Sequence, residues 1–244
     1  MKGKIAVITG GGKGLGKELA KLFSAEGSTV VICSRSANDL KNVCNEIVGA
    51  GGKCEYFVVD VTSKQQVDKF IDKVLSSHGR IDVLVNNAGY ATKWKGIEQN
   101  TEEEFETCFR TNVYSIFYFL KKIVPIMRGQ NSGAIVNISS MAGKRGIPNL
   151  AAYCASKFAV VGLTQSVAKE LKDTDALCIS VCPGGMSTEM RAKIFGVEDA
   201  EKQQSPQYVA NVIKDVLLGR IKVPNGGDII IRYGEITAIN PAPE

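Results

Sequence analysis

The amino-acid sequence predicts an α/β fold, with a doubly wound (Rossmann-type), mostly parallel sheet of about seven strands and helices on both faces. Short runs rich in Val and Ile alternate with longer segments in which apolar residues recur every three or four positions. Several of the short runs are apolar throughout, which is typical of parallel strands covered on both faces. No linker, repeat or low-complexity tract interrupts the alternation, so residues 1–244 are predicted to form a single domain.

Each predicted element rests on its own pattern. The runs predicted as strands are residues 5–9, 29–34, 54–59, 83–86, 134–139, 179–182 and 228–232. Between them, apolar residues at helical spacing mark three stripes: Leu15, Leu19, Leu22 and Phe23; Leu40, Val43 and Ile47; and Val67, Phe70, Ile71, Val74 and Leu75. Two longer helices are predicted over about residues 105–127 and 153–171. Strand–helix–strand order then implies right-handed crossovers between parallel strands.

Composition excludes several classes of protein. Lys and Arg total 30 against 25 Asp and Glu, and the formal net charge of +5 is spread along the chain, so no nucleic-acid partner is expected. Hydrophobic residues make up 44% of the chain, enough for a sizeable core. No apolar run reaches the roughly 18 residues of a membrane span, and the first residues lack the long apolar stretch of a signal peptide. We therefore expect no membrane association and a cytoplasmic location.

The cysteines support the same location. They stand at positions 33, 44, 54, 108, 154, 178 and 182, mostly inside apolar runs and without a CxxC pair. Free cysteines in such runs behave as small buried hydrophobic residues. The sequence therefore predicts free thiols, no disulfide framework and no metal site, as in a reducing compartment.

A glycine-rich turn follows the first predicted strand directly. It reads Thr9-Gly10-Gly11-Gly12-Lys13-Gly14-Leu15-Gly16 and opens a helix. Glycines there allow a tight turn and let backbone N–H groups approach a pyrophosphate, which the helix N-terminus also attracts. The residues expected to hold a dinucleotide here are Gly10, Gly12, Lys13, Gly14, Leu15 and Gly16.

The end of the second predicted strand indicates which dinucleotide is bound. Dinucleotide folds that use NAD(H) usually place a carboxylate there, on the ribose 2′-hydroxyl. This strand instead ends in Ser34 and Arg35. A guanidinium attracts a 2′-phosphate that a carboxylate would repel, and Lys13 extends toward the same region. The sequence therefore favours NADP(H) over NAD(H); the alternative is that Arg35 is only a surface charge.

Further polar motifs follow later strands. Asn86-Asn87-Ala88-Gly89 follows the fourth predicted strand, Ser139-Ser140 ends the fifth, and Pro183-Gly184 follows the sixth. The carboxyl ends of parallel strands form the edge at which such sheets bind ligands. Tyr153 and Lys157 are four residues apart and share one face of a predicted helix.

Together, and in this order, these motifs resemble the short-chain dehydrogenase/reductase family, in its form of about 250 residues, over essentially the whole chain. The resemblance implies a catalytic set of Asn112, Ser140, Tyr153 and Lys157. It also implies that Asp60 and Val61 face the adenine, and that Asn87, Ala88 and Gly89 line the cofactor cleft. Other cofactor contacts implied are Ser34, Arg35, Tyr153, Lys157, Pro183, Gly184, Met186 and Thr188, with the Thr188 hydroxyl on the nicotinamide carboxamide.

The chemistry of hydride transfer explains this residue set. The nicotinamide supplies the hydride, and the protein must supply a proton and stabilise the developing alkoxide. A free tyrosine has a pKa of about 10, and an ammonium about 5 Å away is expected to lower it by roughly two units. Tyr153 would then exchange protons near neutral pH, beside Ser140 on the substrate oxygen. Asn112 would hold a water that links Lys157 to solvent.

The predicted function is an NADP-dependent oxidoreductase acting on a small carbonyl or secondary alcohol, as a ketone or 3-oxoacyl reductase. The alternative is a non-catalytic NADP(H)-binding redox sensor. The resemblance also implies a homodimer or homotetramer built through the two long helices. The apolar run at residues 116–120 on the first helix fits either an interface or a buried core helix.

The sequence does not decide between two interpretations for each of two residue groups at the expected substrate cleft. Trp94, Met186, Met190, Ile194 and Phe195 either form a pocket wall or cap the core. The basic residues Lys93, Lys95, Lys144 and Arg145 either attract an anionic substrate or lie on a solvated face.

Overall fold

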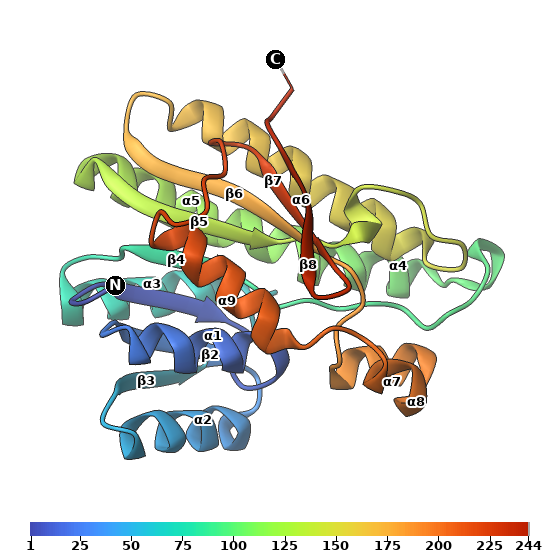
Figure 1. Cartoon of the computed structure of the whole chain (residues 1–244), viewed down its shortest axis with the longest axis horizontal. Helices are drawn as coiled ribbons and strands as arrows, with labels where there is room; N and C mark the ends of the chain where they lie inside the picture. The colour runs from blue at the N-terminus through green and yellow to red at the C-terminus, as the bar shows by residue number, and fades with distance from the viewer. Residues whose placement is uncertain (244) are drawn as a thin grey trace.

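A single eight-stranded sheet runs through the chain in the order β3-β2-β1-β4-β5-β6-β7-β8 (Figure 1). The computed structural model describes residues 1–243. The strands are β1 (Ile5–Thr9), β2 (Thr29–Ser34), β3 (Lys53–Val58), β4 (Val83–Asn86), β5 (Ser132–Ile138), β6 (Asp175–Pro183), β7 (Asp228–Arg232) and β8 (Glu235–Asn240). All neighbouring pairs are parallel except β7 and β8. The predicted doubly wound α/β fold is therefore confirmed.

Helices cover both faces of this sheet, and the apolar side chains of each strand alternate between two cores. The helices are α1 (Gly14–Ala25), α2 (Ala37–Gly49), α3 (Lys64–His78), α4 (Glu102–Phe109), α5 (Ser115–Gln130), α6 (Ala151–Glu170), α7 (Glu189–Phe195), α8 (Val197–Glu201) and α9 (Pro206–Leu217). Ala6 and Ile8 of β1 face the core under α1, α2 and α9. Ile5 and Val7 face the core under α3, α5 and α6. The order of β1 and β4 in the sheet creates a switch point between these strands, where doubly wound folds bind ligands.

Several elements differ from the sequence prediction. The strand β8 and the helices α7, α8 and α9 were not predicted. The helix predicted over residues 105–127 is divided by a π-helical turn, η2 (Arg110–Tyr114), between α4 and α5. Positions 108, 112, 116 and 119 are all buried, so a spacing of three or four residues continues through this turn and the sequence pattern does not reveal it.

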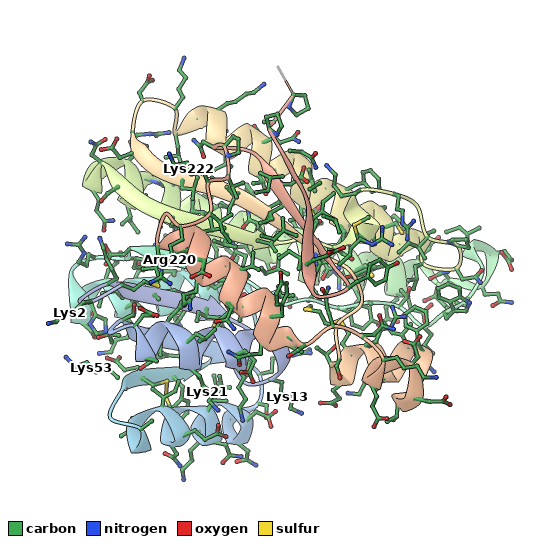
Figure 2. All side chains as sticks on the ribbon, viewed as in Figure 1. Lys2, Lys13, Lys21, Lys53, Arg220 and Lys222 are labelled. Carbon is green, nitrogen blue, oxygen red and sulfur yellow. A yellow bond between two sulfur atoms is a disulfide. The ribbon has the colours of Figure 1, made fainter. Side chains whose placement is uncertain are left out.

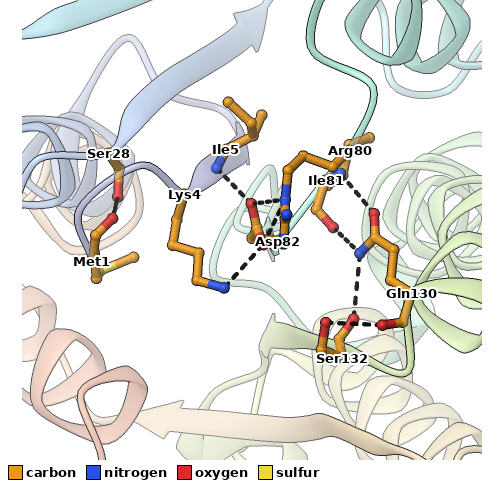
Figure 3. A network of polar contacts seen from close by, with 9 residues as sticks. All are labelled: Met1, Lys4, Ile5, Ser28, Arg80, Ile81, Asp82, Gln130 and Ser132. Carbon is orange, nitrogen blue, oxygen red and sulfur yellow. Dashed lines mark hydrogen bonds and ion pairs between the residues drawn. The ribbon is translucent and has the colours of Figure 1, made fainter.

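A network around Asp82 joins the amino ends of β1 and β4, at the edge opposite the strands' carboxyl ends (Figure 3). Asp82 is 3% exposed and accepts hydrogen bonds from the Ile5 N–H at 2.9 Å and the Lys4 ammonium at 3.1 Å. The Arg80 guanidinium contacts both of its oxygens. Burial opposes ionisation of Asp82, but the bonds from Arg80, Ile5 and Lys4 outweigh it and lower its pKa. The carboxylate therefore holds two central strands in place.

The cysteine prediction is wrong for one pair. Cys44 in α2 and Cys54 in β3 form a disulfide, with their Cα atoms 5.3 Å apart. The short turn between α2 and β3 brings the end of the helix back onto the neighbouring strand, a proximity that the sequence spacing alone does not show. The five other cysteines are free and buried, as expected.

No helix within residues 1–243 is both long enough and apolar enough to span a bilayer.

Candidate active site

The glycine-rich turn between β1 and α1 is shaped by close backbone contacts. Gly10 has a φ of +65°, in the left-handed region that favours glycine. A Cβ at Gly16 would stand 2.2 Å from the Gly10 carbonyl oxygen, so only glycine lets α1 begin this close to the turn. The turn is therefore fixed with its backbone at the carboxyl end of β1.

Polar bonds fasten the glycine-rich turn to the end of β4. The Thr9 hydroxyl accepts hydrogen bonds from the N–H groups of Asn87 and Ala88, both at 2.9 Å. The Asn87 side-chain amide donates to the carbonyl oxygens of Thr9 and Gly10, at 3.0 and 3.2 Å. The segment predicted to line a cofactor cleft thus lies directly beside the glycine-rich turn.

A cavity of about 650 Å³ opens above this switch point. The predicted cofactor residues in its lining are Gly10, Gly12, Lys13, Gly14, Leu15, Ser34, Arg35, Asn87, Ala88, Gly89, Tyr153, Lys157, Met186 and Thr188. The glycines of this lining and the exposed Arg35 fit a phosphorylated dinucleotide.

The structure does not bring the other predicted cofactor residues into that lining: Gly16, Asp60, Val61, Pro183 and Gly184. Gly16 instead lies in the first turn of α1, where the lack of a Cβ lets the helix pack against Gly10. The Asp60 carboxylate accepts bonds from the backbone and hydroxyl of Thr62, at 2.9 and 2.8 Å, and Val61 is buried in the core. Gly184 lines a second cavity instead.

The end of β2 presents a basic group to the first cavity. Arg35 is exposed there, and no carboxylate lies within ion-pair distance of it among residues 1–243. Lys13 pairs with Glu189 of α7 at 3.0 Å and with Asp39 of α2 at 3.3 Å, which raises its pKa. Sequence reasoning missed both partners, because Glu189 lies far along the chain and Asp39 lies past the strand tip. Figure 2 shows Lys13 where the glycine-rich turn faces α7.

Tyr153 and Lys157 are positioned by the first turns of α6. The Lys157 ammonium nitrogen lies 5.7 Å from the centroid of the Tyr153 ring. The lysine is 4% exposed, and its Nζ donates a hydrogen bond of 2.8 Å to the Ile138 carbonyl at the end of β5. The strand therefore fixes the ammonium beside the aromatic ring.

Burial shifts the two pKa values toward the neutral forms. It raises the pKa of Tyr153 to about 12, although a hydrogen bond with Ser140 opposes the rise. It lowers the pKa of Lys157 to about 8. The predicted lowering of the tyrosine pKa is therefore not found in this structure. Desolvation of the phenolate outweighs the attraction of an ammonium that lies over the ring and bonds to a carbonyl.

Asn112 stands in the π-helical turn η2 and is completely buried. Its Oδ1 accepts a bond from the Tyr90 N–H at 2.8 Å, while its Nδ2 donates to the Tyr90 carbonyl at 2.8 Å and the Ser156 hydroxyl at 2.9 Å. Both amide protons are thus used inside the protein, so the side chain is not free to donate to the water expected from the sequence. Asn112 positions the segment after Gly89, close to Lys157.

A second cavity, of about 880 Å³, meets the first at Tyr153, which lines both. Ser140 lines this second cavity, and its hydroxyl accepts a bond from the Ala142 N–H at 3.1 Å. A carbonyl group placed here would reach Ser140 and Tyr153 while facing the first cavity. The geometry thus suits a reaction between a molecule in each cavity.

Apolar side chains form one wall of the second cavity. They include the five candidates left open by the sequence: Trp94, Met186, Met190, Ile194 and Phe195. Trp94 and Phe195 contact each other edge to face, with ring centroids 5.0 Å apart. The structure therefore favours the pocket-wall interpretation for this group.

Sequence reasoning missed a further part of the lining of the second cavity. It is formed by residues from segments without a recognisable motif: Gln203, Gln204, Tyr208, Arg232 and Tyr233. Gln204 connects these segments, because its side chain donates a hydrogen bond to the Ile231 carbonyl at 3.0 Å and accepts one from the Gly234 N–H at 3.1 Å.

Comparison with known proteins agrees with this geometry. The family model described as short chain dehydrogenase matches residues 4–199. The chain is 37% identical over 194 residues to the 3-oxoacyl-acyl-carrier-protein reductase FabG of Thermotoga maritima, covering 80% of this chain and 78% of that protein. It is 32% identical to an NADPH-dependent pterin aldehyde reductase of Arabidopsis thaliana, with 93% of each covered. The solved structure of levodione reductase matches with a TM-score of 0.90 at 28% identity, over 96% of this chain and 98% of that one.

Proposed function

The chain belongs to the short-chain dehydrogenase/reductase family of nicotinamide-dependent oxidoreductases, and from that premise we propose that it reduces a carbonyl group of a small molecule to an alcohol with NADPH. The observation that carries the proposal is the position of Tyr153 at the junction of the two cavities, beside Ser140. Several relatives are named as reductases of carbonyl compounds, which supports the reductive direction.

The state of Tyr153 suits a proton donor. With a pKa of about 12, the phenol keeps its proton at neutral pH and can give it to the oxygen of a carbonyl under reduction. Ser140 can donate a hydrogen bond to the same oxygen, an interaction that strengthens as negative charge develops. The bound nicotinamide supplies the hydride. Lys157 then returns a proton toward Tyr153, since its pKa of about 8 leaves it largely charged at neutral pH.

The preference for NADP(H) over NAD(H) is also part of the proposal. It is supported by Arg35, an exposed guanidinium at the end of β2 that lines the first cavity. A 2′-phosphate would accept charge-assisted bonds from Arg35, whereas Lys13, in the same lining, would have to exchange its pairs with Asp39 and Glu189 for the phosphate. The printed name of the plant reductase specifies NADPH for that protein.

NADPH oxidation, followed at its absorbance maximum with a panel of ketones, aldehydes and 3-oxoacyl thioesters, tests the function. We expect consumption with some members of the panel and little with NADH. Tight NADPH binding without consumption by any carbonyl compound would instead favour the redox-sensor alternative.

A homodimer or homotetramer is proposed through α4, α5 and α6. Large apolar side chains are exposed on these helices and the turn between them: Phe105, Tyr114, Phe117 and Phe158, with exposed fractions of 40 to 51%. Such a surface is more typical of an interface than of a solvated face. Light scattering should give a mass at least twice 26.2 kDa, and Phe117→Glu should reduce it.

A cytoplasmic location is proposed from the five buried free thiols, although the Cys44–Cys54 disulfide is more typical of an oxidising compartment. Fractionation of cells that express the full chain would test this location.

A further inference from the structure

The second cavity, where the carbonyl compound would bind, has a lining with charges of one sign. Its charged side chains are Arg145, Arg191, Lys202 and Arg232, and no Asp or Glu lines it among residues 1–243. A cleft lined by cations concentrates anions, because its low-dielectric walls focus the field.

Two of these cations are already neutralised by acidic partners outside the lining. Arg191 contacts Asp199 through two nitrogens, at 2.5 and 3.1 Å, and stacks on the Phe195 ring. Lys202 pairs with Glu198 at 2.7 Å. In the described part of the chain, Arg145 and Arg232 have no carboxylate within ion-pair distance.

Arg232 lies at the end of β7 and contacts the side chain of its neighbour Tyr233, which is 80% exposed. Its Cγ lies 3.3 Å from where a Cβ of Gly184 would stand, so its stem occupies space that the glycine leaves free. Its Nη2 donates a 2.6 Å bond to the Tyr233 hydroxyl, and the guanidinium lies 4.8 Å from the centroid of that ring. A guanidinium carries five N–H donors, so most of them remain available for a ligand in the cavity.

Arg145 is the second cation with an available charge. It lies just after the short helix η3 (Met141–Gly143), whose preceding residue is Ser140, and it is exposed. The neighbouring basic side chains are not available to bind an anion in this cavity. Lys95 pairs with Glu104 and Lys144 with Asp228, and Lys93 is not in the lining.

We propose that the natural substrate carries an anionic group, a carboxylate or a phosphate monoester, which Arg232 binds with help from Arg145 while the carbonyl group contacts Ser140 and Tyr153. This inference rests on the proposed reductase function and narrows its substrate class. The anion belongs to a small molecule, because both guanidiniums line a cavity of about 880 Å³, together with the apolar side chains described above. Planar, fork-like donors suit carboxylate and phosphate oxygens in particular.

Matched pairs of compounds test this inference. Oxo-acids of increasing length are compared with their methyl esters, and dihydroxyacetone phosphate with dihydroxyacetone, by NADPH consumption. We expect kcat/KM for one anionic compound to exceed that of its neutral partner by about 10- to 100-fold, the range for a hydrogen bond to a charged group. The comparison of oxo-acids with their esters tests for a carboxylate site, and the comparison of dihydroxyacetone phosphate with dihydroxyacetone tests for a phosphate site. Neutral compounds that react as well as every anionic partner would overturn the proposal.

Arg232→Gln should lower the ratio of kcat/KM for the anionic compound to that for its neutral partner by about tenfold or more, mainly through KM. Arg232→Lys keeps the charge and should recover part of the ratio. Arg220→Gln is the control, because Arg220 already pairs with Asp215 and lies at the far end of α9 (Figure 2). An unchanged ratio in Arg232→Gln would contradict the proposal. The proposal would also be contradicted if a thioester on an acidic carrier protein were reduced faster than the small anionic compounds and Arg232→Gln did not change that rate.

A binding measurement separates failure of this inference from failure of the proposed function. Trp94, the only tryptophan, lines the cavity and is 42% exposed, so its fluorescence reports ligands there. With NADP bound, the anionic compound should change this fluorescence at a lower concentration than its neutral partner, and Arg232→Gln should remove the difference. If no compound is reduced, the reductase function fails, yet this titration still supports or overturns the anion site.

Discussion

The Lys157 ammonium lies 5.7 Å from the centre of the Tyr153 ring, and both groups are shifted toward their neutral forms by burial. The pair therefore supplies a phenol that holds its proton together with a lysine that titrates close to neutral pH. This combination suits donation of a proton to a reduced carbonyl, with Lys157 as the group whose charge depends on pH.

The first prediction concerns pH. Lys157 is charged below its pKa of about 8 and loses its proton as the pH rises through that value, whereas Tyr153 stays protonated up to about 12. For carbonyl reduction, kcat/KM should be level at neutral pH and fall above about pH 8. Lys157→Met should lower kcat/KM and remove its fall above pH 8. A native profile that stays level well above pH 8 would exclude Lys157 as the titrating group.

The second prediction concerns the coenzyme. Arg35→Asp replaces an attractive charge by a repulsive one, so the ratio of kcat/KM for NADPH to that for NADH should fall by about 100-fold or more. Lys172→Asp, at an exposed position after α6, is a control with the same change of charge. An unchanged ratio in Arg35→Asp would remove the assignment of Arg35 to the 2′-phosphate.

The third prediction concerns stability. Asp82→Asn removes a buried carboxylate bonded to Arg80, Lys4 and Ile5, and should lower the free energy of unfolding at neutral pH by about 2 to 4 kcal/mol. Asp68→Asn, whose surface carboxylate pairs with Lys64, should change it far less, because solvent screens an exposed pair.

The dependence of this stability difference on pH tests whether the charge of Asp82 causes it. The folded-state pKa of Asp82 is lowered, so its ionic stabilisation is present above the unfolded pKa, near 3.8, and is lost as the pH falls through the folded value. In urea unfolding, the difference between the native protein and Asp82→Asn should therefore shrink below that pH. A difference that stays constant would point to packing rather than charge.

The fourth prediction concerns the Cys44–Cys54 disulfide. The protein denatured without reductant should show five reactive thiols, and seven after reduction. Closing a loop of this size should stabilise the fold by about 2 kcal/mol, so reduction should lower Tm by a few degrees. Cys44→Ser should lower Tm similarly and make it insensitive to reductant. Seven thiols before reduction would show that the bond does not form.

The sequence predicts the parallel part of the sheet well, because strands covered on both faces are apolar throughout. The bounds of β1, β2, β4 and β7 agree with the prediction. The edge strand β8 alternates exposed and partly buried residues and begins with Glu235, so its apolar signal is too weak to detect. The short helix α7 lines the cavities and α8 packs on α7 rather than on the sheet, so both lack a continuous apolar stripe.

Most of the motif residues predicted at the cofactor cleft do line the first cavity, because each motif follows a strand end and strand ends share one edge; Asp60 and Val61 do not. Residues that reach the site through tertiary contacts could not be predicted. Glu189 meets Lys13 across 176 residues of sequence, and Arg232 reaches the second cavity from β7. The direction of the Tyr153 pKa shift was also beyond the sequence, since spacing gives the proximity of Lys157 but not the depth of burial.

The central claim is that Tyr153 donates the proton in an NADPH-dependent carbonyl reduction, and Tyr153→Phe tests it most directly. NADPH affinity is measured by titration, and turnover is measured with the best substrate of the panel. We expect an affinity within a few-fold of that of the native protein and a turnover lower by about 10³-fold or more. Undiminished NADPH consumption by Tyr153→Phe would contradict the account.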